Sequence, residues 1–397
     1  MSGPLHGIKI VEMTSVVLGP WACQLLADMG AEVVKIEQPR GDSNRTLGAA
    51  TNPGMSALYL TCNRNKRSIA VDFASPEGAA LLRQLATKAD IVIENFKVDG
   101  LKKYGLDWES LRAVKPNLVY CSVTGFGQIG PYANRGGYDF VAQGMGGFMA
   151  ITGEEGGPPV RVGASIGDIV AGMYLTQGIL TALYQRESTG LGCKIDIAML
   201  DAQLAILEHA VAIASVTGAA PGPTGARHPS ITPFSTYRAA DGFFVIAAGN
   251  DALFAKLCDA LDLPDLAKDL RFVTNAARCE NVALLKRLIE SQTLNASRAH
   301  WIARLERFGV PTGKVQNVSE ALEDPQLLAR NMVLPITPRP GGPAFVGAGN
   351  PIKMTGLEER VAHPSSPALD QDRATILEWL AAAEKQQTAK SDTLPKK

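Results

Sequence analysis

The feature that most constrains the fold is the alternation of two sequence periods over the first 126 residues. Short β-branched runs recur at intervals of about 25 residues, and stretches with helical spacing of apolar residues separate several of them. Because strands that alternate with helices in this way pair in parallel, the pattern predicts β-α-β units and a doubly wound sheet. The runs are Ile8–Met13, Glu32–Gln38, Ser68–Phe73, Asp90–Phe96 and Leu118–Phe126.

Two of the intervening stretches carry helix boundary signals. Gly19–Gly30 has Pro20 near its start, where a missing N–H costs nothing, and ends on a glycine that stops a helix. Pro76–Ala89 has proline and glutamate in its first turn and Lys88 in its last, which complements the helix dipole. Both stretches therefore favour helices between the predicted strands.

The following segment differs in character. Residues 136–167 are rich in glycine and have little periodicity. A loop of this length without regular secondary structure is more often functional than a simple connection. After it we expect a long apolar helix over 169–186, a strand over 194–199 and a helix over 200–216.

The second half of the chain predicts a further domain. Residues 217–230 are mostly Gly, Pro, Thr and Ala, which indicates a linker, and two extended runs around Ala239–Gly242 predict a hairpin. Three helical stretches follow. The domains expected are a large doubly wound domain over 1–216, a smaller α+β domain over 231–330, a C-terminal segment over 331–385 that returns to the large domain, and a flexible tail over 386–397.

Composition narrows the function classes. The 39 Lys+Arg balance the 39 Asp+Glu, so the basic surplus typical of nucleic-acid-binding proteins is missing. Six cysteines without a CxxC pair and five scattered histidines fit neither a disulfide scaffold nor a metal site. The apolar stretch 166–184 is interrupted by Asp168 and glycines, which favours a buried core helix over a membrane span. The N-terminus does not resemble a signal peptide, and we expect a cytoplasmic protein without membrane or nucleic-acid partners.

One motif resembles a dinucleotide fingerprint. Gly125-Phe-Gly127-Gln-Ile-Gly130 matches GxGxxG and follows a predicted strand. That strand is a late one, and the residues that come next break any helix whose N-terminus could hold a pyrophosphate. We therefore interpret the motif as a glycine-rich active-site loop and not as an NAD site.

Asp168 is the acidic residue that most needs an explanation, since it opens the long apolar helix after a run of small residues. An aspartate in this place is a favoured N-cap, which contributes about 1 kcal/mol. It could equally be a functional carboxylate at the positive end of a helix, where small neighbours let a bulky ligand approach. The two interpretations are compatible, and the residues alone do not choose between them.

Basic side chains adjoin the predicted strands in two clusters, Asn63–Arg67 and Lys97 with Lys102 and Lys103. They are either solvated surface charge or cations that contact an anionic nucleotide at the strand ends. Arg227 in the linker is either solvated or paired with a substrate carboxylate.

Several long motifs resemble one family over nearly the whole chain. They are GIKIVEMTSVVLGPWACQLLADMGAEVVKIEQP, NKRSIAVD, ADIVIENFKVDGLKKYGLD, PNLVYCSVTGFGQIGPYANRGGYDFVAQGMGG, GDIVAGMYLTQGILTAL, MLDAQLA and GVPTGKVQNVSEALEDPQLLARNM. On these motifs the chain resembles the family III CoA-transferases, the group of carnitine, bile-acid and formyl-CoA transferases. The resemblance implies a Rossmann-like large domain, a small domain, and a homodimer of two interlocked chains.

The resemblance also implies site residues. Asp168 falls on the catalytic aspartate, and Arg227, His228 and Asp139 are implied to bind substrate. Two positions depart from the family pattern: Gln38 stands where some members carry arginine, and Val17 replaces a glutamine of formyl-CoA transferase, which argues against that specificity. The residues implied to bind CoA are Gln38, Val71, Asn95, Phe96, Lys97, Lys103, Arg135, Gly136, Gly137 and Tyr138.

The implied activity is transfer of coenzyme A from an acyl-CoA thioester to a free carboxylic acid, through an aspartyl anhydride and an aspartyl-CoA thioester at Asp168. Coenzyme A is then a substrate, and the route requires neither a prosthetic group nor a metal. The stretch Arg227–Phe234 resembles members that use short dicarboxylates such as succinate, whose distal carboxylate suits Arg227. Two alternatives stay open. One is an α-methylacyl-CoA racemase, although Tyr138 replaces a histidine base there; the other is a non-catalytic CoA-binding protein.

Overall fold

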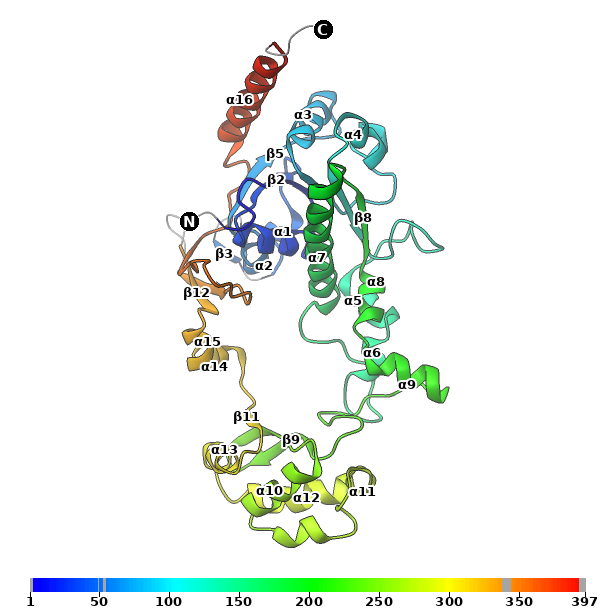
Figure 1. The fold of residues 1–397 in the computed structure, drawn as a ribbon, viewed down its shortest axis with the longest axis vertical. Coiled ribbons are helices and arrows are strands. Elements are labelled where there is room, and N and C mark those ends of the chain that lie inside the picture. The colour runs from blue at the N-terminus through cyan, green and yellow to red at the C-terminus, as the bar shows by residue number, and fades with distance from the viewer. Residues whose placement is uncertain (1–2, 49, 53–54, 338–343, 393–397) are drawn as a thin grey trace. The chain divides into compact units, whose positions relative to one another are not determined.

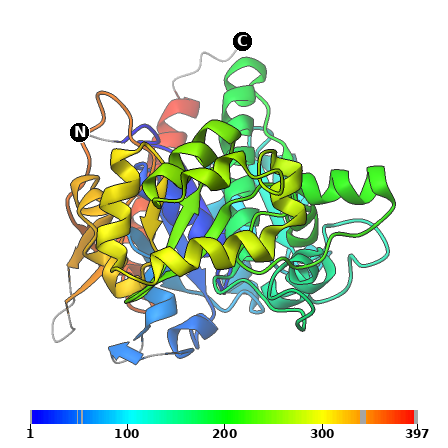
Figure 2. The ribbon, with the colours of Figure 1, turned by 90° about the horizontal axis from the view of Figure 1, so that it is seen from below.

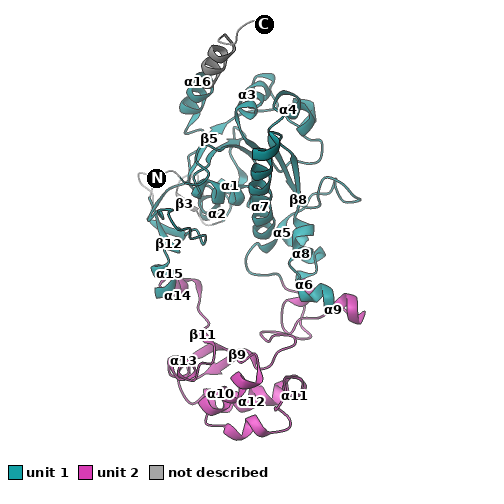
Figure 3. Ribbon diagram, viewed as in Figure 1, with its two compact units in different colours: residues 1–148, 161–212, 325–397 teal, residues 149–160, 213–324 magenta. Residues whose placement is uncertain are grey.

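The computed structural model describes residues 3–48, 50–52, 55–337 and 344–392. The chain divides into two compact units (Figure 3). Unit 1 comprises Met1–Phe148, Arg161–Ala212 and Pro325–Lys397, and unit 2 comprises Met149–Val160 and Ile213–Asp324. The short segment 149–160, which we expected in the large domain, thus groups with unit 2.

Unit 1 is built on a six-stranded sheet whose neighbouring strands all run parallel, in the order β5-β2-β1-β6-β7-β8 (Figure 1). The predicted parallel sheet is therefore confirmed. Chain order reverses between β1 and β6, and the carboxyl ends of the strands beside such a switch point are where α/β sheets bind ligands. The strands are β1 (Lys9–Met13), β2 (Glu32–Glu37), β5 (Lys66–Ala70), β6 (Ile91–Glu94), β7 (Val119–Thr124) and β8 (Lys194–Ala198).

Helices cover both faces of this sheet, because side chains alternate along each buried strand. Ile10 belongs to the core under α1 (Leu18–Asp28) and α7 (Ile166–Thr189). The adjacent Val11 belongs to the opposite core, which residues of three other helices complete. Those helices are α3 (Pro76–Lys88), α4 (Trp108–Val114) and α16 (Arg373–Asp392).

Helix α7 is long and apolar enough to cross a membrane by those two criteria alone. Half of its most apolar window is buried inside the structure, and Leu175 and Ile179 are completely covered. This burial agrees with the core helix that the interrupted apolar stretch predicts.

The predicted helix over 200–216 is wrong in one respect. It is broken into α8 (Met199–Ala205) and α9 (His209–Thr217), which meet at 75°. Glu208 lies between them with φ of 56°, a left-handed conformation that ends a helix. Neither glycine nor proline marks this break in the sequence.

Helix α16 runs from Arg373 to Asp392 and so extends into the expected tail over 386–397, of which 393–397 lie outside the described residues. The remaining elements of unit 1 are short. They are β3 (Ala50–Asn52), β4 (Met55–Ser56), α2 (Ala57–Cys62), α5 (Asp139–Met145), α15 (Pro325–Ala329), β12 (Val333–Thr337), β13 (Phe345–Ala348), β14 (His363–Pro364), and α6 (Phe148–Ile151), which continues into unit 2.

Unit 2 is a three-stranded sheet packed against helices (Figure 2). The expected hairpin is present, since β9 (Phe234–Ala239) and β10 (Gly242–Ala247) pair antiparallel. Phe244, Phe254 and Leu285 are fully or almost fully buried in its core. The other elements are β11 (Thr312–Lys314), α10 (Asp251–Ala260), α11 (Asn275–Glu280), α12 (Val282–Thr293), α13 (Arg298–Arg307) and α14 (Val318–Leu322).

Candidate active site

A cavity of about 220 Å³ in unit 1 lies at the switch point. Its walls come from the loops that follow β1, β6 and β7 and from the first turn of α7, so that carboxyl ends of neighbouring parallel strands converge on it. Residues that line it include Ser15, Val16, Leu18, Asn95, Phe96, Lys97, Gly125, Arg135, Gly136, Gly137, Tyr138, Asp168 and Met199.

Asp168 is the third residue of α7 and is 7% exposed. Burial is the largest cause that raises its pKa from 3.8 to about 7, and the nearby carboxylate of Asp139 raises it further. The backbone amide of Leu18, the first residue of α1, opposes this rise through a hydrogen bond to the carboxylate. Asp168 therefore lies at the first turns of two helices, and its carboxylate lacks a cationic side-chain partner among the described residues.

Asp139 supports the backbone next to Asp168. Its Oδ1 accepts a hydrogen bond from the backbone N of Gly167 at 2.8 Å, and its Oδ2 accepts one from Nε2 of Gln143 at 2.8 Å. A Cβ on Gly167 would lie 2.9 Å from Oδ1 of Asp139, so only glycine fits this approach. Both oxygens of Asp139 thus accept a hydrogen bond from the chain, which indicates a positioning role; its contact with substrate stays a prediction.

The loops after β1 and β6 are tied together by one asparagine. Oδ1 of Asn95 accepts from the backbone N of Ser15 at 3.2 Å, and its Nδ2 donates to the backbone O of Ser15 at 3.0 Å. Asn95 was implied to bind CoA; it lines the cavity and also holds the rim of the cavity in place.

The loop after β7 passes close to the segment Arg135–Tyr138. A Cβ on Gly125 would lie 2.6 Å from the Cα of Gly137, so the two backbones pack directly against each other. Gly127 has φ of 82° and turns follow it instead of a helix, which agrees with an active-site loop instead of a dinucleotide fingerprint. The guanidinium of Arg135 lies over the rings of Phe126 and Tyr132.

The cavity brings together most of the residues implied to bind CoA. Gln38, Val71 and Lys103 are not among the residues that line it. Val71 is buried in the core of unit 1, whereas Lys103 is exposed, with its ammonium 4.7 Å from the ring centroid of Tyr104. Phe73 connects this surface to the cavity, since its ring contacts both Tyr104 and Phe96 edge to face.

Arg227 and His228 belong to unit 2. Nη2 of Arg227 lies 3.4 Å from Oε2 of Glu155, a partly exposed pair between the linker and the segment 149–160. The ring of His228 contacts Phe234 edge to face, and its Nδ1 accepts a hydrogen bond from the backbone N of Ser230.

The basic cluster Asn63–Arg67 is largely buried and not solvated surface charge, since Asn63, Arg64 and Lys66 are buried and only Asn65 and Arg67 are partly exposed. Lys66 is buried and pairs with Glu12 of β1 at 2.7 Å, and Arg64 pairs with Asp28 at 2.6 Å. The cluster lies at the amino end of β5, of which Lys66 and Arg67 are the first two residues. A signal for this buried network was present, because charged residues interrupt strands that are otherwise apolar, as Lys35 does in Glu32–Glu37.

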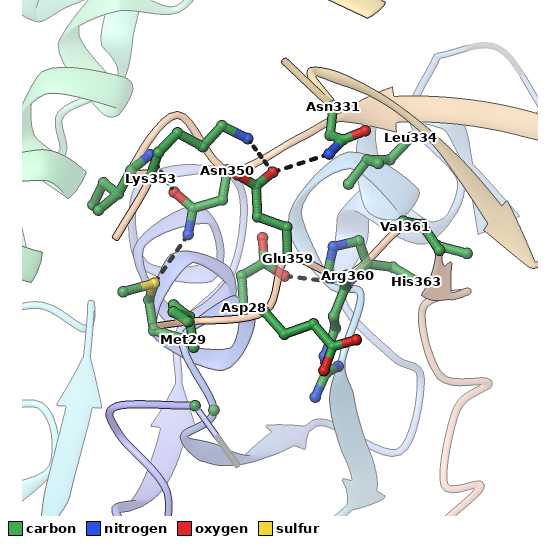
Figure 4. Close-up of a pocket in the computed structure, with 16 residues that line it drawn as sticks. Asp28, Met29, Asn331, Leu334, Asn350, Lys353, Glu359, Arg360, Val361 and His363 are labelled. Carbon is green, nitrogen blue, oxygen red and sulfur yellow. Dashed lines mark hydrogen bonds and ion pairs between the residues drawn. The ribbon is translucent and has the colours of Figure 1, made fainter. Parts of the chain in front are cut away.

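A second pocket of unit 1, of about 400 Å³, lies at the C-terminal end of α1 (Figure 4). Its charged side chains largely pair with one another; for example, Glu359 accepts from Lys353 at 2.6 Å and from Asn331 at 3.2 Å. None of the predicted site residues lines it. Within the described part of the chain, no group of three or more His, Cys, Asp or Glu residues is placed to hold a metal ion.

Comparisons with known proteins agree on one family. The profile described as CoA-transferase family III matches residues 5–373. The succinate–glutarate CoA-transferase of Agrobacterium fabrum is 42% identical over 97% of this chain and 98% of its own length. The acetyl-CoA:oxalate CoA-transferase of Acetobacter aceti is 40% identical over 96% of this chain and 97% of its own length. The crystal structure of a CaiB/BaiF family protein from Brucella suis matches with a TM-score of 0.86 and 43% identity, covering 96% of this chain and all of the other.

Proposed function

Because the chain belongs to CoA-transferase family III, we propose that it transfers coenzyme A between succinyl-CoA and a short dicarboxylic acid, with Asp168 as the nucleophile. The observation that carries the proposal is the position of Asp168: a buried carboxylate at the wall of the switch-point cavity, within reach of the Leu18 amide. Relatives named for succinate with glutarate and for acetyl-CoA with oxalate support the substrate class.

In the proposed route, a carboxylate oxygen of Asp168 attacks the thioester carbonyl carbon of the donor. The C–S bond breaks, the thiolate of CoA leaves, and a mixed anhydride forms. The thiolate then attacks Cγ of Asp168, which releases the donor acid as its carboxylate and leaves an aspartyl-CoA thioester. The acceptor carboxylate reverses both steps. Each step exchanges one carboxylate and one thiolate, so that charge and atoms balance without an added reactant.

Recapture of the thiolate requires that CoA stay bound beside the anhydride, where positioning supplies an effective concentration of about 10⁵–10⁸ M. Water must stay out, because it would hydrolyse the anhydride. When the thiolate adds to Cγ of Asp168, one oxygen of this residue becomes negatively charged. The backbone N–H of Leu18 would stabilise that charge by donating a hydrogen bond to the oxygen. Because the pKa of Asp168 is raised to about 7, about half of its carboxyl groups are ionised near neutral pH. Asp168 can therefore act as a nucleophilic carboxylate without a cationic partner.

We assign the CoA contacts to the exposed basic residues beside the cavity, chiefly Lys97, Lys103 and Arg135, whose cations suit phosphate groups. Arg227 would bind the distal carboxylate of a dicarboxylic acid in exchange for Glu155. Tyr138 is 69% exposed and carries a phenol in place of the imidazole base that a racemase would use there, which disfavours a racemase.

We also propose the interlocked homodimer. An apolar stripe on α7 supports it, since Met173, Leu180 and Tyr184 are 56%, 43% and 83% exposed in the single chain. Exposed apolar surface of this kind on one long helix is typical of a surface that another chain covers. Sedimentation of the purified protein tests this part, and a monomer at micromolar concentration would exclude it.

An exchange assay tests the function. The protein is mixed with succinyl-CoA and glutarate or oxalate, and the new CoA thioester is separated and quantified. Asp168→Asn should abolish exchange. Asp201→Asn is the matched control, because Asp201 is likewise the third residue of a helix, α8, but is exposed. Exchange of the α-proton in deuterated water with no acid exchange would favour a racemase, and CoA binding with no reaction would favour a non-catalytic protein.

A further inference from the structure

Residues 14–20 comprise the connection from β1 and the first turn of α1; this segment, called the loop below, carries Ser15, Val16 and Leu18 into the cavity wall. Three backbone carbonyls of this loop accept hydrogen bonds from buried side chains. Nζ of Lys35 donates to the O of Thr14 at 2.9 Å, and Nζ of Lys66 donates to the O of Pro20 at 2.8 Å. The third donor is Nδ2 of Asn44, which bonds the O of Val16. The loop is thus held from inside the protein at both ends and in the middle.

Both lysines also have ion-pair partners outside the loop. An ammonium group has three N–H donors. Lys35 contacts Glu12 at 3.2 Å and Asp42 at 3.0 Å besides Thr14, and its side chain is completely buried. Lys66 contacts Glu12 at 2.7 Å, Asn63 and Pro20. Each lysine therefore donates one hydrogen bond to the loop, while carboxylates balance its charge, Glu12 and Asp42 at Lys35 and Glu12 at Lys66.

The middle of the loop needs such support because it is strained. Val16 has φ of 71°, a left-handed conformation that a β-branched residue adopts rarely and at a cost of about 1–3 kcal/mol. Asn44 bonds the carbonyl of this residue, and its own backbone N donates to Oδ1 of Asp42 at 2.9 Å, which links it to Lys35. Strained residues persist only where their surroundings determine them.

We propose that Lys35, Lys66 and Asn44 are positioning residues that hold the loop so that its backbone amide at Leu18 faces the Asp168 carboxylate. The proposal rests on the proposed function, since it gives the amide a part in catalysis. It differs from a general stabilising role of the buried ions, because all three donors are aimed at carbonyls of one loop, and that loop forms the cavity wall.

Asn44→Leu tests this most sharply. Leucine has the shape of asparagine, so it leaves little cavity, and Oδ1 of Asn44, which is buried, has no hydrogen-bond partner within the described ranges to be lost. The substitution removes essentially the bond to Val16. Asn44→Asp is a second variant of the same size that also lacks the amide donor. Asn281→Ala is the matched control, because Nδ2 of Asn281 donates to the backbone O of Ala277 in unit 2.

The three positioning residues Lys35, Lys66 and Asn44 are called the clamp below. Two measurements separate the role of the clamp from the proposed function. Hydrogen exchange of the peptide that contains Val16–Leu18 reports the loop without any reaction. The single-turnover rate with succinyl-CoA and the affinity for coenzyme A report catalysis and binding separately. In Asn44→Leu we expect at least tenfold faster exchange in this peptide, about ten- to a hundredfold slower turnover and unchanged CoA affinity, with the control unaffected.

The outcomes are distinguishable. Unchanged loop exchange in both Asn44 variants, or turnover within twofold of the wild type, would overturn the clamp while leaving the function intact. Equal losses in turnover and CoA affinity would also overturn it, because they would indicate a general structural effect. If the wild type itself shows no transfer, the proposed function fails, and faster exchange confined to this loop would still support the clamp.

Discussion

Replacing Asp139 by asparagine tests what sets the ionisation of Asp168. Burial is the larger cause that raises the pKa of Asp168 from 3.8 to about 7, and the negative charge of Asp139 is the second. Asparagine keeps an oxygen that can accept the hydrogen bond from Gly167, but its NH₂ group loses the bond from Nε2 of Gln143, whose Oε1 accepts from the backbone N of Val162. The substitution therefore removes the repulsion between two carboxylates together with one hydrogen bond.

The rise from 3.8 to about 7 corresponds to roughly 4 kcal/mol. Since burial contributes most, we expect Asp139→Asn to lower the midpoint of the acidic limb by about one pH unit, which is about 1.4 kcal/mol. At pH 6 the ionised fraction of Asp168 then rises from about one tenth to about one half, so that the first half-reaction becomes about fivefold faster. At pH 8.5 Asp168 is ionised in both proteins, and the rates converge.

The assay is the single-turnover rate with succinyl-CoA between pH 5 and pH 9. Asp201→Asn serves as the control, because it removes an exposed carboxylate from the first turn of α8. A midpoint that stays in place or moves to higher pH in Asp139→Asn would refute the argument that the two carboxylates repel each other.

Three further predictions follow from the same contacts. Asp168→Asn should stabilise the fold by up to about 4 kcal/mol at pH 8 but not near pH 4. Because the pKa of this buried carboxyl is raised, its ionisation destabilises the folded wild type as the pH rises from about 4 through about 7. Denaturation curves at the two pH values test this, and equal gains at both would contradict it. Lys66→Met should lose about 3–5 kcal/mol in urea denaturation, since it breaks a buried pair with Glu12. Arg67→Met should lose less than about 1 kcal/mol, since its pair with Glu32 is partly exposed, and similar losses would contradict the distinction. Gly125→Ala should weaken CoA binding about tenfold in calorimetry, because the new Cβ would lie 2.6 Å from the Cα of Gly137; unchanged affinity would show that the two segments can separate.

The central sheet could be predicted because its strands and helices carry their own local signals. Five of its six strands overlap the β-branched runs of the sequence, and the helix Pro76–Lys88 has proline and glutamate in its first turn. The bend between α8 and α9 could not, since it depends on Glu208 in a left-handed conformation with neither glycine nor proline to mark it. Local sequence specifies an element well, but tertiary contacts decide where an apolar helix breaks.

The candidate site shows the same contrast between what the sequence indicates and what only the folded chain shows. Asp168, Asn95 and Arg135 could be assigned to one site through the family resemblance, and in the folded chain all three line one cavity. The pairing of Asp139 with Gly167 could not be predicted, since the two residues are far apart in sequence and meet only in the folded chain. The burial of Lys66 could not be predicted, because a run such as Asn63–Arg67 is usually exposed, and only its packing beside Glu12 shows otherwise.

The central claim is that Asp168 forms covalent intermediates, and mass spectrometry of the trapped protein tests it most directly. The wild type and Asp168→Asn are each incubated with succinyl-CoA without an acceptor acid, treated with hydroxylamine, digested and sequenced. We predict a hydroxamate on the Asp168 peptide of the wild type and none on the corresponding peptide of the variant. Transfer of CoA to glutarate without any modification of Asp168, or with full activity in Asp168→Asn, would contradict the account.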